Sequence, residues 1–237
     1  MDETPATVPD TLPTAFLDRA LFALRPFGEM VIRMELAFGH ELDADRLARA
    51  VELAMDAEPV LGCRLDAEPK HGEWIRLPPS ERPGLCVVGE AEEYERERAR
   101  TVDPEVGPLL SACLLQRPEG DHLLIKVAHE VADAGAVKRI ASLLATLYGR
   151  LEGEPGYTPT PNVGGSRSLE QLTRQIPWTA KPAIMASFIR EALLQNASGP
   201  CLTVPLEQEE DLEPSFPTRT LSRERAREVV DFAKGHD

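Results

Sequence analysis

The chain has 237 residues, of which 42% are hydrophobic and 28% are charged, as in an ordinary globular protein with a substantial core. Its 40 acidic and 26 basic residues give a net charge of -14, which argues against nucleic acid and anionic membranes as main partners. No apolar run approaches the length of a membrane-spanning helix and the acidic start is unlike a signal peptide, so a cytoplasmic protein is expected.

Hydrophobic periodicity predicts alternating strands and helices in the first part of the chain. Residues 1–11 are expected to form a disordered leader. Apolar alternation predicts a strand over 30–38, and Asp43 precedes an apolar stripe that predicts a capped helix through Ala57. A charge-rich, solvated helix is predicted over 92–101. Further strands are predicted over 60–65, 74–77, 85–88, 109–115 and 122–128.

The clearest helix pattern follows these strands, where apolar residues keep a 3.6-residue period from Ala136 to Leu151. A stretch rich in Gly and Pro then predicts a linker over 153–180. Three more elements are predicted: a helix over 181–194, a short strand over 201–204 and a helix over 222–234. This order predicts an α+β fold, an α/β sandwich with a mixed, largely antiparallel sheet flanked by helices. Residues 12–152 are expected to form one domain.

One short stretch combines a strand end, a histidine and a tight turn. His129 follows the apolar run 123–128, and Asp133 comes four positions later, just before the long helix pattern. An imidazole at a strand end can reach solvent, and its unperturbed pKa of about 6.5 suits proton transfer near neutrality. From the residues alone, a packed or surface histidine remains an alternative. Glu130 either orients the imidazole or faces solvent, and no further ligands indicate a metal site.

The segment Ala128-His129-Glu130-Val131-Ala132-Asp133-Ala134 resembles the HHxxxDG motif of the chloramphenicol-acetyltransferase-like superfamily. That superfamily includes condensation domains of nonribosomal peptide synthetases and related CoA-dependent acyltransferases. His129 matches the second motif histidine, and Asp133 matches the motif aspartate. Segments 42–50, 58–61 and 107–110 resemble the family's first helix, its His-Pro-x-Leu strand start and its Gly-Pro-Leu turn. The resemblance covers about residues 12–235 and corresponds to the N-terminal half of such a protein.

Three positions depart from the family pattern. Ala128 replaces the first motif histidine, and Ala134 replaces the motif glycine, with Gly135 one place later. Gly62 stands where the family often carries an arginine that pairs with the motif aspartate. Because residues two apart in a strand share a face, Arg64 is expected to replace that arginine as the partner of Asp133.

The resemblance implies a condensation-type acyltransferase. An acyl group would pass from a thioester, either acyl-CoA or a carrier-protein phosphopantetheine arm, to an amine or hydroxyl acceptor. His129 would act as the general base, Asp133 with Arg64 would fix the loop, and the backbone N–H groups around Ala134 and Gly135 would stabilise the oxyanion. No tightly bound cofactor and no metal are expected.

The resemblance also implies that residues 181–237 begin a second half that this sequence cuts short. Members of the family place the active site between two similar halves. The alternative to an enzyme is therefore a non-catalytic binding module, or an inactive half, that binds a thioester or a carrier protein. The face that would meet the missing half is expected to be apolar and to favour self-association.

Overall fold

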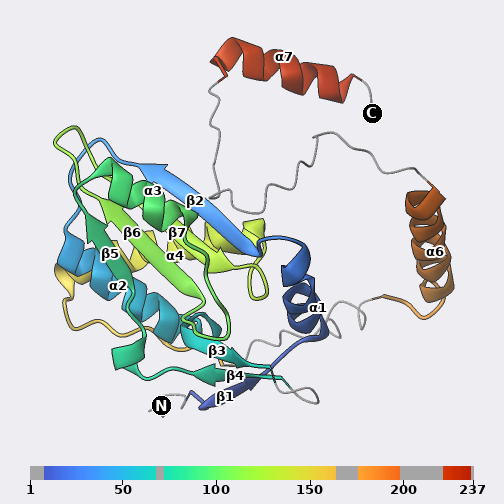
Figure 1. Cartoon of the computed structure of the whole chain (residues 1–237), viewed down its shortest axis with the longest axis horizontal. Coiled ribbons are helices and arrows are strands. Elements are labelled where there is room, and N and C mark those ends of the chain that lie inside the picture. The colour runs from blue at the N-terminus through green and yellow to red at the C-terminus, as the bar shows by residue number, and fades with distance from the viewer. Residues whose placement is uncertain (1–7, 68–71, 164–175, 198–220, 236–237) are drawn as a thin grey trace. The chain divides into compact units, whose positions relative to one another are not determined.

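Two β-sheets form the framework of the chain in the computed structural model, which describes residues 8–67, 72–163, 176–197 and 221–235 (Figure 1). The larger sheet has the strand order β2-β7-β6-β5, in which β2, β7 and β6 are antiparallel and β5 runs parallel to β6. Its strands are β2 (Val31–Ala37), β5 (Leu85–Val88), β6 (Leu110–Leu115) and β7 (His122–Ala128). The smaller sheet is antiparallel, in the order β1 (Thr11–Pro13), β4 (Glu73–Arg76) and β3 (Cys63–Asp66).

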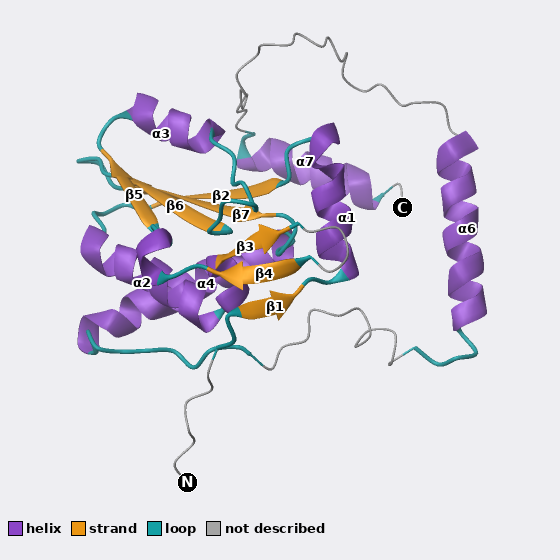
Figure 2. Cartoon of the chain, turned by 60° about the horizontal axis from the view of Figure 1, so that its bottom comes forward, coloured by secondary structure: helices purple, strands orange, loops and turns teal. Residues whose placement is uncertain are grey.

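Helices lie on both faces of the larger sheet, with α2 and α4 on one side and α3 on the other (Figure 2). The helices of the described ranges are α1 (Phe16–Leu24), α2 (Ala44–Ala57), α3 (Ala91–Ala99), α4 (Ala134–Gly153), α6 (Lys181–Ala197) and α7 (Arg223–Lys234). Short 3-10 helices occupy Arg25–Phe27, Pro59–Gly62 and Pro79–Glu81. The predicted α+β class, with a mixed and largely antiparallel sheet flanked by helices, is confirmed.

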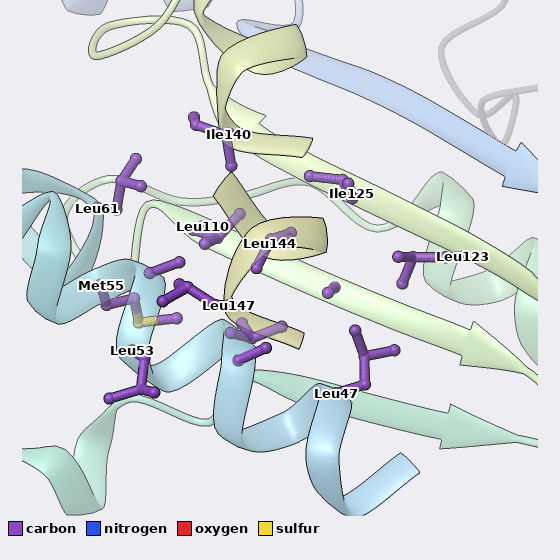
Figure 3. Packing of buried hydrophobic residues seen from close by; sticks show 14 of the residues in the cluster. Leu47, Leu53, Met55, Leu61, Leu110, Leu123, Ile125, Ile140, Leu144 and Leu147 are labelled. Atoms are coloured by element: carbon purple, nitrogen blue, oxygen red, sulfur yellow. The ribbon is translucent and has the colours of Figure 1, made fainter. Parts of the chain in front are cut away.

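The main core lies between the larger sheet and the helices α2 and α4. On β7, side chains of alternate residues point to opposite faces, so Leu123, Ile125 and Val127 pack toward α2 and α4 (Figure 3). From the helices, Leu47 and Met55 of α2 and residues of α4 spaced by one helical turn fill the same space. Each fully buried side chain of this kind contributes about 1.5–3 kcal/mol to the free energy of folding. This core fixes the direction in which β7 leads into α4.

The opposite face of β7 carries a buried lysine. The ammonium group of Lys126 donates to the main-chain carbonyl oxygens of Glu97 (2.6 Å) and Arg100 (3.1 Å), at the end of α3. Burial lowers the pKa of Lys126, and the nearby Glu97 carboxylate, 3.6 Å from the ammonium, opposes that shift. A cation suits this place, because the last carbonyl groups of a helix have no partners within the helix.

Most predicted elements lie where the sequence patterns indicated, and Asp43 caps α2 by accepting a hydrogen bond from Arg46 N (3.0 Å). Two differences concern the smaller sheet. The strand predicted from residue 60 begins only at Cys63, because Pro59 starts a 3-10 helix through Gly62. Thr11, expected in a disordered leader, pairs with Ile75 in the smaller sheet. The strand predicted over 201–204 lies outside the described residues.

Gly107 precedes β6 in a conformation that only glycine adopts without strain. Its φ of 63° is positive, and a side chain there would lie 2.5 Å from the carbonyl oxygen of Cys63. This residue belongs to the Gly-Pro-Leu segment that the sequence singled out. Glycine is therefore needed where the chain passes closely over β3 and enters β6.

The chain divides into two units, Met1–Gly199 and Pro200–Asp237, and α6 falls within the first unit. In the second unit α7 is capped by Ser222, whose hydroxyl oxygen accepts from Arg225 N (3.2 Å), and it ends at Gly235. Among the helices of the described ranges, none has the length and apolar character needed to cross a membrane.

Candidate functional site

The turn between β7 and α4 carries the motif residues 128–134. Its backbone is anchored to both neighbouring strands of the sheet. Ala128 N donates to Leu109 O (3.0 Å), ahead of β6, and His129 N donates to Met30 O (2.9 Å), ahead of β2. A third bond, from Val131 N to Ala128 O (3.1 Å), closes the turn itself. The His129 backbone is therefore held by the sheet, although the residue lies just beyond the last strand position.

The imidazole of His129 is half-buried and makes one specific contact. Its Nδ1 lies 2.9 Å from the carbonyl oxygen of Ala132, three residues later in the same turn. A carbonyl oxygen can only accept a hydrogen bond, so Nδ1 carries the proton in the neutral ring. The lone pair is then on Nε2, which leaves that nitrogen to accept a proton.

A pocket of about 220 Å³ lies beside His129 and is closed on one side by α1. The helix contributes Leu17, Asp18 and Leu21, and the turn contributes residues 129–133. The sequence did not indicate that α1 belongs to the site, because no local pattern relates residues more than a hundred positions apart. The hydrogen bond that Trp74 Nε1 donates to the buried Asp18 carboxylate (2.9 Å) fixes α1 to the smaller sheet.

The Glu130 side chain is fully buried, so it does not face solvent, which was one of the two positions that the sequence left open for it. Burial raises the pKa of the Glu130 carboxyl group. A backbone hydrogen bond, the guanidinium of Arg25 and the nearby His129 oppose that shift. The carboxylate oxygen lies 3.8 Å from Nε of Arg25, directly after α1. Both residues line the pocket, but Glu130 is buried whereas His129 is half-buried.

Asp133 is the N-terminal cap of α4. Its Oδ1 accepts a hydrogen bond from Ala136 N at 2.7 Å, and the residue is exposed beside the pocket. Within the described part of the chain, it forms no ion pair with Arg64. The expected Asp133–Arg64 pair is thus not formed in this structure, whereas a role of Asp133 in ordering the turn fits its capping bond.

The reasoning that selected Arg64 depended on a strand that includes position 62. Gly62 instead ends a 3-10 helix, so the rule that residues two apart share a face does not apply. The space beside Gly62 is filled by Arg82, whose Cδ would lie 2.9 Å from an added Cβ. The guanidinium of Arg82 binds Asp56 (3.0 Å) and not the motif aspartate.

Ala134 and Gly135 are the first two residues of α4. In the first turn of a helix the N–H groups have no acceptor within the helix and carry partial positive charge, which suits a developing anion. Neither residue has a positive φ, so this turn does not require glycine at either position. Neither lines the pocket, whose nearest boundary on this side is Asp133.

Ala128, at the position of the first motif histidine, is fully buried. Its neighbours form a second apolar cluster between the two sheets: Cys63, Leu65, Trp74, Val102 and Leu109. The position contributes packing under the turn and offers no polar group to the pocket. Among the residues that the structure describes, no group of three or more His, Cys, Asp or Glu side chains is arranged to hold a metal ion.

No protein-family model and no curated protein sequence matches this chain. Solved structures do share its fold. The epimerization domain from the third module of tyrocidine synthetase B has a TM-score of 0.55 and 16% identity, covering 73% of this chain and 42% of that one. The starter condensation domain of rhizomide synthetase RzmA has a TM-score of 0.54 and 18% identity, covering 77% and 48%. Polyketide synthase associated protein 5 from Mycobacterium tuberculosis has a TM-score of 0.52 and 19% identity, covering 65% and 38%.

The chain spans less than half the length of these three structures. At such identities the likeness concerns the fold. Over the part that is covered, the chain therefore has the fold of these epimerization and condensation domains, as the resemblance of the motif segment implied.

Proposed function

We propose that this chain supplies the histidine side of a condensation-type acyl-transfer site. An acyl group would pass from a thioester, either acyl-CoA or a carrier-protein phosphopantetheine arm, to an amine or hydroxyl acceptor. The observation that carries the proposal is the position of the His129 imidazole, which lines a pocket. Its Nδ1 is hydrogen-bonded to Ala132 O, so Nε2 is the nitrogen that can accept a proton. The remaining walls of the site would come from a second half of the kind that longer proteins of this fold possess.

In the proposed reaction the acceptor nitrogen or oxygen attacks the thioester carbonyl carbon while Nε2 of His129 takes the acceptor's proton. A tetrahedral oxyanion forms, and it collapses as the C–S bond breaks. The leaving thiolate receives the proton from the imidazolium, so the products are the amide or ester and the free thiol. General base catalysis of this kind is worth about 10²–10⁴ in rate.

The start of α4 would face the oxyanion in this proposal. The N–H groups of Ala134 and Gly135 are unsatisfied within the helix, and the helix dipole adds positive potential there. Asp133 would act through the turn, because its carboxylate holds the first turn of α4 in place. Its role is thus one of positioning, whereas His129 is the catalytic residue.

The proposed partners are a donor thioester, an acceptor and a covering second half. Leu17 lines the pocket while remaining 49% exposed, and the neighbouring Phe16 is 72% exposed. Large apolar side chains at the rim of a pocket are typical of a face that another protein surface covers. This supports the expectation that the face beside the pocket meets a second half or a second copy of the chain.

The test is thiol release by the intact protein that contains this chain. Acetyl-CoA, octanoyl-CoA and octanoyl-pantetheine serve as donors, and butylamine or butanol as acceptor, with free thiol measured colorimetrically and the product by mass spectrometry. We expect His129→Ala to lower the rate by about 10²–10⁴. His122→Ala is the matched control, since His122 is also half-buried but begins β7 at its other end.

Equal rates for the wild type and His129→Ala would overturn the proposal. A thioester that stabilises the protein against heat but is never turned over would leave a binding module, the alternative that the sequence allowed.

A further inference from the structure

Arg25 lies at the junction of three segments that are distant in sequence. It directly follows α1 and begins the 3-10 helix Arg25–Phe27. Its Nε lies 3.8 Å from Oε1 of Glu130 in the motif turn, and its Nη1 lies 3.1 Å from Oδ1 of Asp103, between α3 and β6. The guanidinium also lies over the ring of Phe22, 5.8 Å from its centroid. One side chain therefore joins α1, the turn and the loop before β6.

Each of the segments that Arg25 joins is anchored separately to the framework. The motif turn is bound to the larger sheet through His129 N. The loop that carries Asp103 is bound to the smaller sheet, because Pro104 O accepts from Leu65 N at 2.6 Å. At its start, α1 is held through Asp18, which accepts from Trp74 Nε1. Arg25 provides the corresponding attachment at the end of α1.

The position of α1 matters because this helix is one wall of the His129 pocket. Leu17, Asp18 and Leu21 face the pocket, and the attachment points Asp18 and Arg25 lie at either end of that stretch. We infer that Arg25 is a positioning residue, which holds α1 against the motif turn through Glu130 and Asp103 and so sets the width of the pocket beside His129. We call these contacts of Arg25 with Glu130 and Asp103 the clamp. A role of the pocket width in catalysis rests on the proposed acyl transfer, whereas the clamp itself does not.

The burial of Glu130 makes this ion pair more than a surface contact. Its side chain has no exposed area, and that of Arg25 is only 25% exposed. Removing one partner of a pair at such a site leaves the other charge poorly solvated, which costs more than breaking an exposed pair. The second contact, to Asp103, fixes the orientation of the guanidinium group. A lysine at this position has a single ammonium group, which cannot contact both carboxylates as well as the planar guanidinium does.

The experiment measures access to the His129 ring without any substrate. The folded protein is treated briefly with diethyl pyrocarbonate, and the carbethoxylation rate of each histidine is read by peptide mass spectrometry. In Arg25→Met we expect the rate at His129 to rise by about threefold to tenfold, because a loosened α1 exposes the pocket more often. His122, on the same strand, is the internal reference and should keep its rate. Arg25→Lys should restore part of the protection.

The matched control is Arg76→Met. Arg76 has 26% side-chain exposure and an ion pair to Asp56 at 2.9 Å, but it makes no contact with the motif turn among the described residues. This variant should leave the rate at His129 unchanged.

If Arg25→Met fails to fold, Glu130→Gln is the second variant. It keeps the size of the side chain, removes the charge and should by itself raise the modification rate at His129. A wild-type rate at His129 in the folded Arg25→Met variant, or in Glu130→Gln when only that variant folds, would overturn the inference.

The outcome is independent of the proposed reaction, because no turnover is measured. Unchanged thiol release in His129→Ala together with faster modification in Arg25→Met would reject the enzyme and keep the clamp. The reverse combination would keep the enzyme and reject the clamp.

Discussion

Nδ1 of His129 lies 2.9 Å from the carbonyl oxygen of Ala132, so the motif turn itself selects the tautomer of the neutral imidazole. Main-chain carbonyl groups cannot donate, and this one cannot be removed by changing the Ala132 side chain. This hydrogen bond orients the imidazole without a carboxylate partner. It leaves Asp133 available to cap α4, four residues after the ring that it helps to place.

The first prediction concerns the tautomer of His129. The neutral imidazole should be protonated at Nδ1, because only that form donates to Ala132 O. Long-range ¹H–¹⁵N correlation spectra at a pH above the histidine titration would show it, with the His129 signals assigned from the spectrum of His129→Gln. Predominance of the Nε2-protonated form would contradict this assignment of the proton acceptor.

A second prediction concerns the cap of α4. Asp133→Ala removes the acceptor for Ala136 N and should lower the free energy of unfolding by about 0.5–2 kcal/mol, while Asp133→Ser should recover most of the loss. Urea denaturation followed by circular dichroism measures the change. Asp43→Ala, at the equivalent cap of α2, is the matched control and should cost a similar amount. A loss at Asp43 without one at Asp133 would show that the capping bond does not operate.

Restoring the family pattern at two positions should lower stability to different extents. Ala128→His forces an imidazole into a fully buried apolar cluster, and overpacking with a polar group should cost about 1–3 kcal/mol or more. Ala134→Gly changes an exposed position in the first turn of α4 and should cost about 1 kcal/mol or less. Thermal unfolding of both variants makes the comparison. Equal stability of Ala128→His and the wild type would show that the space under the turn is larger than the packing implies.

The buried Glu130 should make stability depend on pH. Its folded-state pKa is raised, so the folded chain holds this proton more tightly than the unfolded chain does. The resulting stabilisation is complete below the unfolded value of about 4.5 and is lost as pH rises through the folded value. The stability of the wild type relative to Glu130→Gln should therefore fall over the range of pH above about 4.5.

Urea denaturation across this range, followed by the fluorescence of the buried Trp74, provides the measurement of that dependence. A difference between the two proteins that stays constant with pH would mean that Glu130 is ionised at the same pH in both states.

Local patterns in the sequence were sufficient for most elements of the fold. The apolar run of β7 and the 3.6-residue period in α4 predicted both elements, because each pattern depends on residues that are close in sequence. Asp43 marked the start of α2 for the same reason, since a cap binds an N–H group only three residues away. The motif placed His129 at a strand end, and the strand bounds agree.

Local sequence patterns could not predict the contacts between distant segments. The expectation that Arg64 pairs with Asp133 assumed a strand through residue 62, whereas Pro59 starts a 3-10 helix there and β3 begins only at Cys63. The burial of Glu130, and the presence of α1 in the site, depend on which surfaces the two sheets bring together. By itself, the sequence determined the order of the elements, the cap of α2 and the chemical identity of the imidazole. Only the tertiary structure decided what surrounds that imidazole, because residues 17–25 meet residues 129–133 through long-range packing that leaves no local periodic signal.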